Sequence, residues 1–484
     1  MITVIEDKRV KEKCQTFTPP HIVKQLLSIS GIKKNDIVGK RFLENSCGNG
    51  AILSSIVETY IHNAQIRGVS NGDIAKDLYD NILAFEIDKE LIKECKKKLD
   101  KIAQKFGIQE VKWNIRYEDF LSAKVSGRFD YIIGNPPYIA YPDLPESTRE
   151  FIGENFETCK NGKWDYNYAF IERSYKLLSD KGSLTYIIPS NIFKNVFAED
   201  IRNLIKEDLT VIVDYPEDNF FKGVLVSPAI INVKKNSHEG KLKYYVYNKG
   251  KKIKTITIKK SLLGLKWIFQ KKEKTNGVRV GDYFKVSSSI ATLCNDAFLL
   301  RGGVLKEGFY LIGDEKIEEG VIRRTTSPKS KRNKVDNEYI IYPYYYEDEK
   351  ICRYLEEEMK SRFPNAYEYL GKYKNRLLRR DSDKNASWFE FGRSQALLHM
   401  NQPMILISSI ISEKTNAYLL KNEIPYSGLY IVPRNDTYSL EYLLELLNSE
   451  DFREYISKTG VCVCGNSKRI SPKDIENYIF DLKS

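Results

Sequence analysis

The sequence contains no long hydrophobic run, and this absence excludes a helical membrane protein. The run that comes nearest, residues 404–411, is far shorter than the roughly 18 residues that a membrane-spanning helix needs. The first residues also lack the pattern of a secretory signal peptide. We therefore expect no membrane association and a cytoplasmic location.

Cysteine is scarce and scattered, which excludes a disulfide-stapled fold. The chain has 8 cysteines in 484 residues, without framework spacing, so reduced thiols are expected. Cys462 and Cys464 stand close together, but no second Cys/His pair lies near them, and no structural metal is expected. Internal repeats and low-complexity tracts are absent too, which excludes a repeat protein.

Length and charge indicate what the chain does contain. A chain of 484 residues is too long for one hydrophobic core, so two or three domains are expected. The texture changes near residue 237, and we place the domains at 1–240 and 241–484. The net charge of +12 favours a polyanionic partner, most simply nucleic acid, and the 32 tyrosines suit surfaces that contact planar groups.

The N-terminal half alternates strand and helix patterns. Residues 41–45 are typical of a strand, and residues 51–60 of an apolar helix. Between them, Gly48 and Gly50 let a ligand approach the backbone, as in the first half of a nucleotide-binding unit. The turn lacks the Gly-Lys-Ser/Thr ending of a Walker A loop, so it predicts a different ligand.

Polar residues follow the next three predicted strands. Glu86 ends the second strand, where an acidic residue is the usual ribose-hydroxyl acceptor, and Asp119 follows the third. The fourth strand, 129–133, runs into Asn135-Pro136-Pro137-Tyr138. The prolines cannot continue a sheet, so they hold an amide, two carbonyls and a ring at the strand end. These groups should line one crevice that suits a planar, amino-bearing substrate.

The C-terminal half combines basic and aromatic residues. Lysine-rich segments at 241–247 and 252–259 indicate exposed antiparallel strands, and tyrosines at 342–346 and aromatics at 388–391 lie between basic clusters. Such a mixture predicts a nucleic-acid surface, because basic residues contact phosphates. The candidate DNA-binding residues are Arg323, Arg324, Lys329, Lys331, Arg332, Lys372, Lys374, Arg376, Arg379 and Arg393.

The order and content of these motifs, over about residues 14–235, resemble the gamma-class, TaqI-like N6-adenine DNA methyltransferases of restriction-modification systems. The resemblance implies an α/β Rossmann-like fold, dependent on S-adenosylmethionine (SAM), with a seven-stranded mixed sheet and helices on both faces. A mixed α+β target-recognition domain should follow. Asn45 and Ser46 depart from the family's Asp/Glu-Pro-Ala-Cys-Gly, where proline and alanine stand.

The resemblance also implies roles for single residues. Glu86 would accept the ribose hydroxyls of SAM, Asp119 its adenine amino group, and Phe170 would pack on that adenine. The full cofactor set is Thr18, Glu44, Cys47, Gly48, Gly50, Glu86, Asp119, Asn135 and Phe170. Asn135, Pro136 and Tyr138 would be catalytic, with Tyr138 and Phe221 stacking on a target base flipped out of the duplex.

The tetrapeptide leaves several other functions open. Protein-glutamine and RNA guanine-N2 methyltransferases also present a planar nitrogen to Asn-Pro-Pro-Tyr, and cytosine-N4 enzymes more often have serine in place of Asn135. A non-catalytic DNA specificity subunit is a further reading. The partners we expect are double-stranded DNA and a separate cognate endonuclease. A fused nuclease is disfavoured, because only 13 residues precede Cys14, too few for an N-terminal nuclease domain.

Overall fold

The computed structural model describes residues 17–218, 220, 227–269, 277–348, 350–412, 414–464 and 467–480. The chain divides into two compact units, Met1–Lys271 and Lys272–Ser484, which are described separately. The boundary that we expected between residues 240 and 241 is therefore wrong. The reason is that strands β8 (Lys241–Asn248) and β9 (Lys251–Lys259) pair into the sheet of the first unit.

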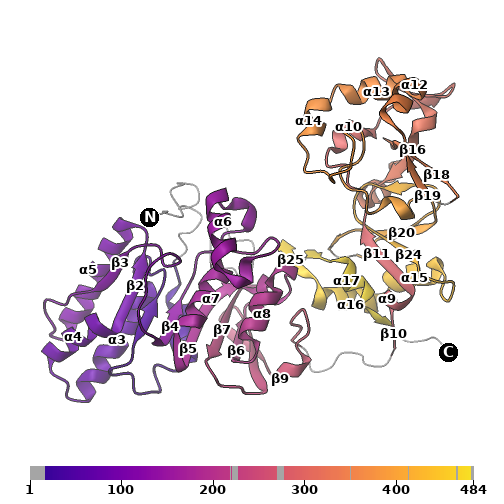
Figure 1. Ribbon diagram of the computed structural model, residues 1–484. Coiled ribbons are helices and arrows are strands. Elements are labelled where there is room, and N and C mark those ends of the chain that lie inside the picture. Colours follow the sequence, from indigo (N-terminus) through magenta and orange to yellow (C-terminus); the bar gives the residue numbers. More distant parts are fainter. Residues whose placement is uncertain are drawn as a thin grey trace. The chain divides into compact units, whose positions relative to one another are not determined.

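The first unit is built on one mixed sheet (Figure 1). Its described strands follow the order β3-β2-β1-β4-β5-β7-β6-β8-β9, so it has nine strands and not the seven expected, because the β8–β9 hairpin extends it. β7 and β9 run antiparallel to their neighbours. The other strand bounds are β1 Phe42–Glu44, β2 Ile82–Glu86, β3 Asn114–Tyr117, β4 Phe129–Gly134, β5 Leu178–Pro189, β6 Leu209–Asp214 and β7 Pro228–Lys234.

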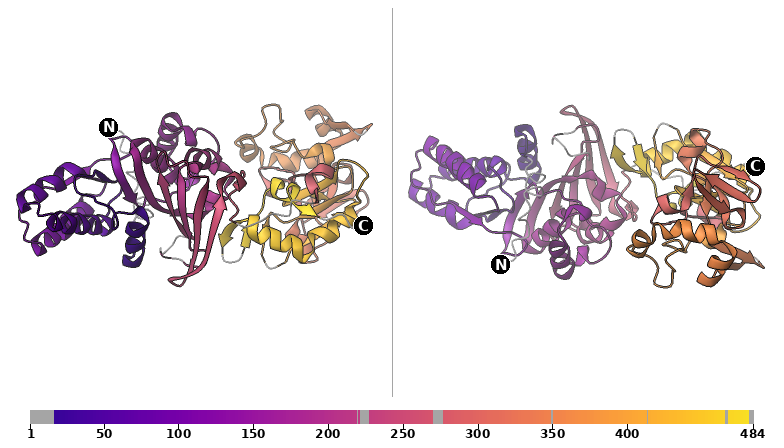
Figure 2. Two further views of the ribbon diagram at one scale, coloured as in Figure 1. Left: turned by 90° about the horizontal axis from the view of Figure 1, so that it is seen from below. Right: turned by 90° about the horizontal axis from the view of Figure 1, so that it is seen from above.

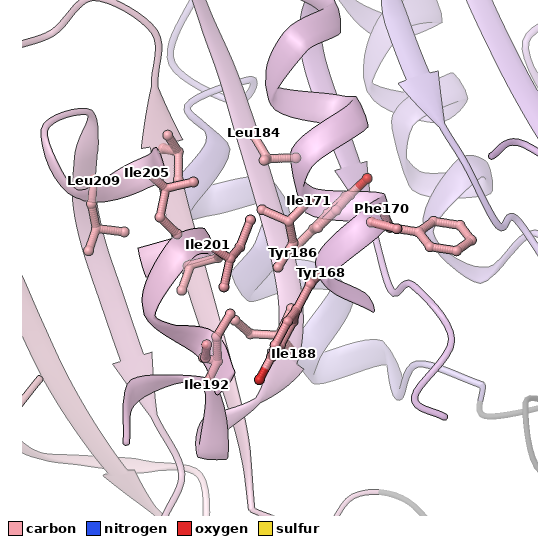
Figure 3. Packing of buried hydrophobic residues seen from close by; sticks show 14 of the residues in the cluster. Tyr168, Phe170, Ile171, Leu184, Tyr186, Ile188, Ile192, Ile201, Ile205 and Leu209 are labelled. Atoms are coloured by element: carbon pink, nitrogen blue, oxygen red, sulfur yellow. The ribbon is translucent and has the colours of Figure 1, made fainter. Parts of the chain in front are cut away.

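Helices cover both faces of this sheet, as expected. One hydrophobic core lies under α2, α3, α4 and α5, and the other lies under α6, α7 and α8. Figure 3 shows the second core, where Ile171 of α7 and Ile201 and Ile205 of α8 pack beside Leu184 and Ile188 of β5. The helix bounds are α2 Pro20–Ser30, α3 Ala51–Ile66, α4 Asn71–Asn81, α5 Lys89–Lys105, α6 Glu146–Asn155, α7 Asn167–Leu177 and α8 Glu199–Lys206.

The local sequence explains the elements that lie nearest the strand ends. Gly50 has φ +81°, and a Cβ there would lie 2.5 Å from the Cys95 sulfur of α5, so only glycine lets α5 pack against the turn. The polar residues that precede β2 form helix α4. The connection 139–165 contains α6 and the short helices η1 (Tyr141–Asp143) and η2 (Glu157–Cys159).

The second unit combines small sheets with short helices around two cores (Figure 2). Its strands are β10 Val278–Arg279, β11 Phe284–Ser288, β12 Leu299–Leu300, β13 Val304–Lys306, β14 Phe309–Ile312, β15 Glu315–Glu318, β16 Ile322–Thr326, β17 Tyr339–Ile341, β18 Tyr344–Glu347, β19 Lys350–Arg353, β20 Met404–Ile407, β21 Ile410–Ile411, β22 Ala417–Leu420, β23 Ile424–Pro425, β24 Leu429–Pro433, β25 Val461–Cys464, β26 Ser467–Arg469 and β27 Ile479–Phe480. Its helices are α9 Val280–Tyr283, α10 Asn295–Phe298, α11 Pro328–Arg332, α12 Glu356–Arg362, α13 Pro364–Gly371, α14 Lys374–Leu378, α15 Leu440–Leu447, α16 Glu450–Thr459 and α17 Pro472–Glu476.

None of the helices that the structure describes combines the length and the apolar character needed to cross a membrane.

Candidate functional site

Four adjacent parallel strands bring the predicted polar residues to one edge of the sheet. β3, β2, β1 and β4 are neighbours in that order and all run the same way. Glu86 and Glu44 are the last residues of β2 and β1, and Asn135 directly follows β4. Asp119 lies just beyond the end of β3. Because their carboxyl ends share one edge, residues distant in sequence become neighbours there.

The side-chain amide of Asn135 is held at both ends. Its Nδ2 donates to Thr18 Oγ1 at 3.3 Å, and its Oδ1 lies 2.5 Å from the Tyr138 hydroxyl. The N-cap of α2 is Pro19, without a side-chain cap, so Thr18 does not cap this helix. Thr18 instead orients the amide, so that Nδ2 faces α2 and Oδ1 faces Tyr138.

Tyr138 anchors the loop after β4 through its hydroxyl. That oxygen also lies 2.8 Å from the carbonyl oxygen of Ile187 in β5, so it has two acceptors within reach. Burial of the hydroxyl raises the pKa of Tyr138 well above its ordinary value. The side chain is therefore neutral and can donate near pH 7, while its ring remains only half-buried.

The two residues that depart from the family motif brace the same segment. Ser46 Oγ donates to the main-chain carbonyl of Asn135 at 3.0 Å. Asn45 is buried, and its Nδ2 donates to Ser174 Oγ at 3.1 Å and to the Tyr186 hydroxyl. The turn after β1, helix α7 and strand β5 are thereby tied together directly beneath the end of β4.

Glu86 links the tip of β2 to the glycine turn. Its carboxylate accepts the backbone N–H of Gly48 at 2.8 Å, of Ile87 at 2.9 Å and of Asp88 at 3.0 Å. Burial raises the pKa of Glu86, although these three bonds oppose the shift. Glu86 therefore stabilises the glycine turn through its carboxylate.

Glu44 is a buried carboxyl with an unsatisfied oxygen. Its Oε2 has no hydrogen-bond partner among the described residues, and only 2% of the residue is exposed. Burial raises the pKa of Glu44 well above its ordinary value, with Cys95 and Glu86 adding to the effect. A buried acceptor without a partner is costly, and binding of a polar ligand would satisfy it.

The neighbouring Cys47 has a structural place. It is buried, and its backbone N–H donates to the carbonyl of Phe85 in β2 at 2.9 Å. A hydrogen bond with Cys95 and burial raise the pKa of the Cys47 thiol well above its ordinary value. Cys47 therefore fixes the turn as a neutral thiol and is not an activated nucleophile.

Asp119 and Phe170 come together through Phe120. The rings of Phe120 and Phe170 are 5.7 Å apart, and Tyr166 meets Phe170 edge-on at 5.3 Å. In Figure 3, the Phe170 ring points away from Tyr168 and Tyr186. Asp119 Oδ1 accepts the Leu121 N–H at 2.9 Å, and burial raises the pKa of its carboxyl.

The predicted base-stacking loop is only partly described. Phe221 lies outside the described residues, so its expected role remains a prediction. Phe220 contacts the ring of His21 on α2 edge-on at 5.3 Å and the ring of Tyr215 at 4.9 Å.

The expected DNA-binding residues of the second unit fall into two groups. Some form ion pairs within the unit: Lys331 with Glu423, Lys372 with Glu315, Arg376 with Asp296, and Arg393 with Asp381 and Asp383. Others are exposed: Arg323 and Arg324 on β16, Lys329 and Arg332 on α11, Lys374 on α14, and Arg379 directly after α14. Lys374 Nζ lies 4.8 Å from the centre of the Trp388 ring.

Three contacts were missed by the sequence prediction: Ser46 to the Asn135 carbonyl, Thr18 to the Asn135 amide, and Tyr138 to Ile187. The departure of Ser46 from the motif was a visible signal, whereas the other two depend on tertiary placement. Within the described ranges, no cluster of His, Cys, Asp and Glu side chains is suited to hold a metal ion.

Comparison with known proteins agrees with this arrangement. Residues 32–221 match the Eco57I restriction-modification methylase family. The Type II restriction enzyme and methyltransferase RM.Eco57I of Escherichia coli is 23% identical over 92% of this chain, which spans 54% of that protein. The Type II methyltransferase M.HincII of Haemophilus influenzae is 25% identical over 96% of this chain and 88% of its own length. The chain is therefore similar in sequence to Type II methyltransferases.

A solved structure shows the same fold. The Type IIL restriction-modification enzyme MmeI, determined in complex with DNA, superposes with a TM-score of 0.59 at 14% identity. The match covers 95% of this chain and 64% of the MmeI chain, so it extends over both units.

Proposed function

We propose that this protein is a DNA methyltransferase that transfers a methyl group from SAM to the N6 amino group of a flipped-out adenine. The observation that carries the proposal is the arrangement at Asn135. Its amide is fixed by Thr18 and Tyr138, and its main chain by Ser46, at the edge where a ligand binds in this type of sheet.

The chemistry follows from two fixed acceptors. The lone pair of adenine N6 is delocalised into the ring, which makes the nitrogen a poor nucleophile. Asn135 Oδ1 and the Pro136 carbonyl accept the two amino hydrogens and return electron density to the nitrogen. Preorganised groups of this kind need no covalent intermediate, and removal of one such group typically costs roughly 3 kcal/mol of barrier.

The residues at the edge of the sheet fit SAM. Glu44 offers an unsatisfied buried oxygen, and the backbone at Gly48 has φ +52°, where only the Phe17 ring lies near an added Cβ, at 3.9 Å. Asp119 and Phe170 would hold the adenine of the cofactor, and Glu86 its ribose. SAM supplies the methyl group as an electrophilic sulfonium. Thr18 and Asn135 orient the acceptors next to it.

The second unit would recognise the DNA. Its exposed arginines and lysines suit phosphates, and the target base must leave the duplex to reach Asn135. Stacking on Tyr138 and Phe221 offsets part of the cost of flipping, since base–aromatic stacking returns roughly 1–3 kcal/mol per base. We also propose that the enzyme modifies a specific site in a restriction-modification system, with a separate cognate endonuclease as partner.

One experiment tests the proposal and separates it from its alternatives. The chain is expressed in a host without DNA methylation, and modified bases are mapped by single-molecule sequencing. N6-methyladenine within one sequence motif is the expected result. N4-methylcytosine would place the enzyme in the other amino-methylating class. Unmodified DNA would point to RNA, to protein or to a non-catalytic specificity subunit.

A further inference from the structure

The β8–β9 hairpin has two chemically different faces. On the inner face, Leu242 and Tyr244 of β8 and Ile256 and Ile258 of β9 are buried in the core under α6, α7 and α8. Since successive side chains of a strand alternate, the residues between them lie on the other face. We call this the outer hairpin face and define it by Lys241, Lys243, Tyr245, Tyr247, Lys252, Thr255, Thr257 and Lys259.

The outer hairpin face is strongly basic. Residues 241–260 include eight lysines and no acidic residue. The four lysines of this face are exposed, and none of them forms an ion pair with any residue that the structure describes. Lys252 Nζ instead lies 5.3 Å from the centre of the Tyr245 ring. Cations without an acidic partner beside aromatic rings are typical of surfaces that bind nucleic acid.

The outer hairpin face lies on the same side of the sheet as helices α2 and α3. Tyr245 and Tyr247 pack at the margin of the core under α2 and α3, and α2 itself packs on β4, β5 and β7. The ring of Tyr247 lies 5.7 Å from that of Tyr215, which in turn lies 4.9 Å from Phe220. A line of aromatic contacts thus joins the hairpin to the loop predicted to hold the target base.

The hairpin turn also lies at the same edge of the sheet as Asn135. β4 and β5 are parallel, β5 and β6 are both antiparallel to β7, and β8 is parallel to β6. β8 therefore runs in the same direction as β4, and the carboxyl ends of both strands lie at the same edge of the sheet. The sheet order β4-β5-β7-β6-β8 separates them by four strand steps. At ~4.8 Å per step this is about 19 Å, or about six base pairs of duplex.

We propose that the outer hairpin face binds the phosphates of duplex DNA that flanks the methylated base. Lys252 lies beside the hairpin turn, and Lys241, Lys243 and Lys259 lie further along the hairpin. The inference rests on the proposed function and adds a DNA contact in the first unit. In this arrangement the lysines position the duplex and do not touch the reacting atoms. They therefore contribute to DNA affinity and leave the chemical step unchanged.

The test uses the full chain and two variants in which the same amount of positive charge is removed. The hairpin variant carries Lys241→Gln, Lys243→Gln, Lys252→Gln and Lys259→Gln. The control variant carries Lys97→Gln, Lys98→Gln, Lys101→Gln and Lys105→Gln, which lie exposed on α5 beside β2 and β3. All eight positions are at the surface, so thermal unfolding should be unchanged and serves as the check on folding.

Binding is measured by fluorescence anisotropy with a labelled duplex that carries the site methylated by the wild type. We expect the hairpin variant to bind roughly tenfold more weakly or worse in moderate salt. The slope of its affinity against salt should be lower by about 0.9 for each phosphate that the protein no longer neutralises. The control variant should keep the wild-type slope, and turnover at saturating DNA should be the same in all three proteins.

Identical salt slopes in the hairpin and control variants would overturn the inference while leaving the methyltransferase proposal intact. If the wild type methylates no DNA, the proposed function fails and the inference fails with it. Weaker binding to a labelled single-stranded RNA of the same sequence, with unchanged binding to the duplex, would also overturn it, because the hairpin would then serve another nucleic acid.

Discussion

The side-chain hydroxyl of Ser46 donates a hydrogen bond to the main-chain carbonyl oxygen of Asn135 at 3.0 Å. This contact joins the glycine-containing turn after β1 to the residue that carries the proposed catalytic amide. Holding that carbonyl fixes the plane of the Asn135–Pro136 peptide, and the two residues that this peptide joins carry the proposed acceptors. Ser46 is therefore a positioning residue that connects the cofactor segment to the acceptor segment.

Replacing Ser46 with alanine should slow methyl transfer without weakening SAM binding. A neutral hydrogen bond is worth about 1 kcal/mol, so the single-turnover rate should fall about fivefold. The matched control is Ser54→Ala in α3, whose buried hydroxyl has no partner among the described residues. Ser46→Thr, which retains a hydroxyl, should recover part of the rate. Equal rates for both alanine variants would contradict the positioning role.

Tyr138→Phe separates the two roles proposed for Tyr138. The substitution keeps the ring but removes the hydroxyl that reaches Asn135 Oδ1 and the Ile187 carbonyl. We expect trapping of 2-aminopurine at the target position to persist, while the rate of methyl transfer falls roughly tenfold, within the range for one hydrogen bond to a reacting group. Loss of the 2-aminopurine fluorescence change together with methyl transfer would contradict this separation of roles, because the hydroxyl would then also position the ring.

The adjacent phenylalanines should behave differently. Phe220 contacts His21 and Tyr215, so Phe220→Ala should lower the melting temperature because this packing is removed. Phe221→Ala should leave the melting temperature unchanged but weaken the 2-aminopurine signal, because this ring is proposed to stack on the flipped base. If Phe220→Ala weakened the 2-aminopurine signal and Phe221→Ala lowered the melting temperature, Phe220 would be the residue that stacks on the base.

Glu44 should make stability depend on pH. Burial raises the pKa of the folded carboxyl above the unfolded value of about 4.3, so the folded state binds the proton more tightly. The stability that this tighter proton binding adds is fully present below the unfolded pKa, and it is lost as the pH rises through the folded pKa. The melting temperature of Glu44→Gln, relative to wild type, should therefore increase as the pH rises above about 5.

The control for this titration is Glu58→Gln, which removes an exposed carboxylate from α3. Glu44→Gln should also weaken SAM binding, measured by calorimetry, because the proposed cofactor loses a carboxylate partner. A difference that is constant with pH in Glu44→Gln would contradict the effect of burial.

The first unit could largely be predicted because its signals are local. Alternating strands and helices, and the turn at Gly48 and Gly50, appear directly in the hydrophobic pattern. The hairpin at 241–259 was also predicted as exposed antiparallel strands, but its membership of the first sheet was not. Nothing local specifies that β8 pairs with β6, since this pairing is made between strands separated by β7 in sequence.

The site was predictable at the level of residue types and strand ends. Glu86, Asp119 and Asn135 could be placed at one edge because parallel strands end together. The hydrogen bonds of Thr18, Ser46 and Tyr138 could not, because they join segments up to 117 positions apart in sequence. In the second unit, the charge pattern identified basic residues but did not distinguish Arg376 and Arg393, which pair with acidic residues, from neighbours that form no ion pair among the described residues.

The most direct measurement is methyl transfer by purified protein to DNA with isotope-labelled SAM, followed by mass spectrometry of the nucleosides. We expect labelled N6-methyl-2′-deoxyadenosine from the wild type, and a rate reduced by about two orders of magnitude or more in Asn135→Ala, in which SAM still binds. Labelled product on another nucleoside, or near-normal turnover by Asn135→Ala, would contradict it.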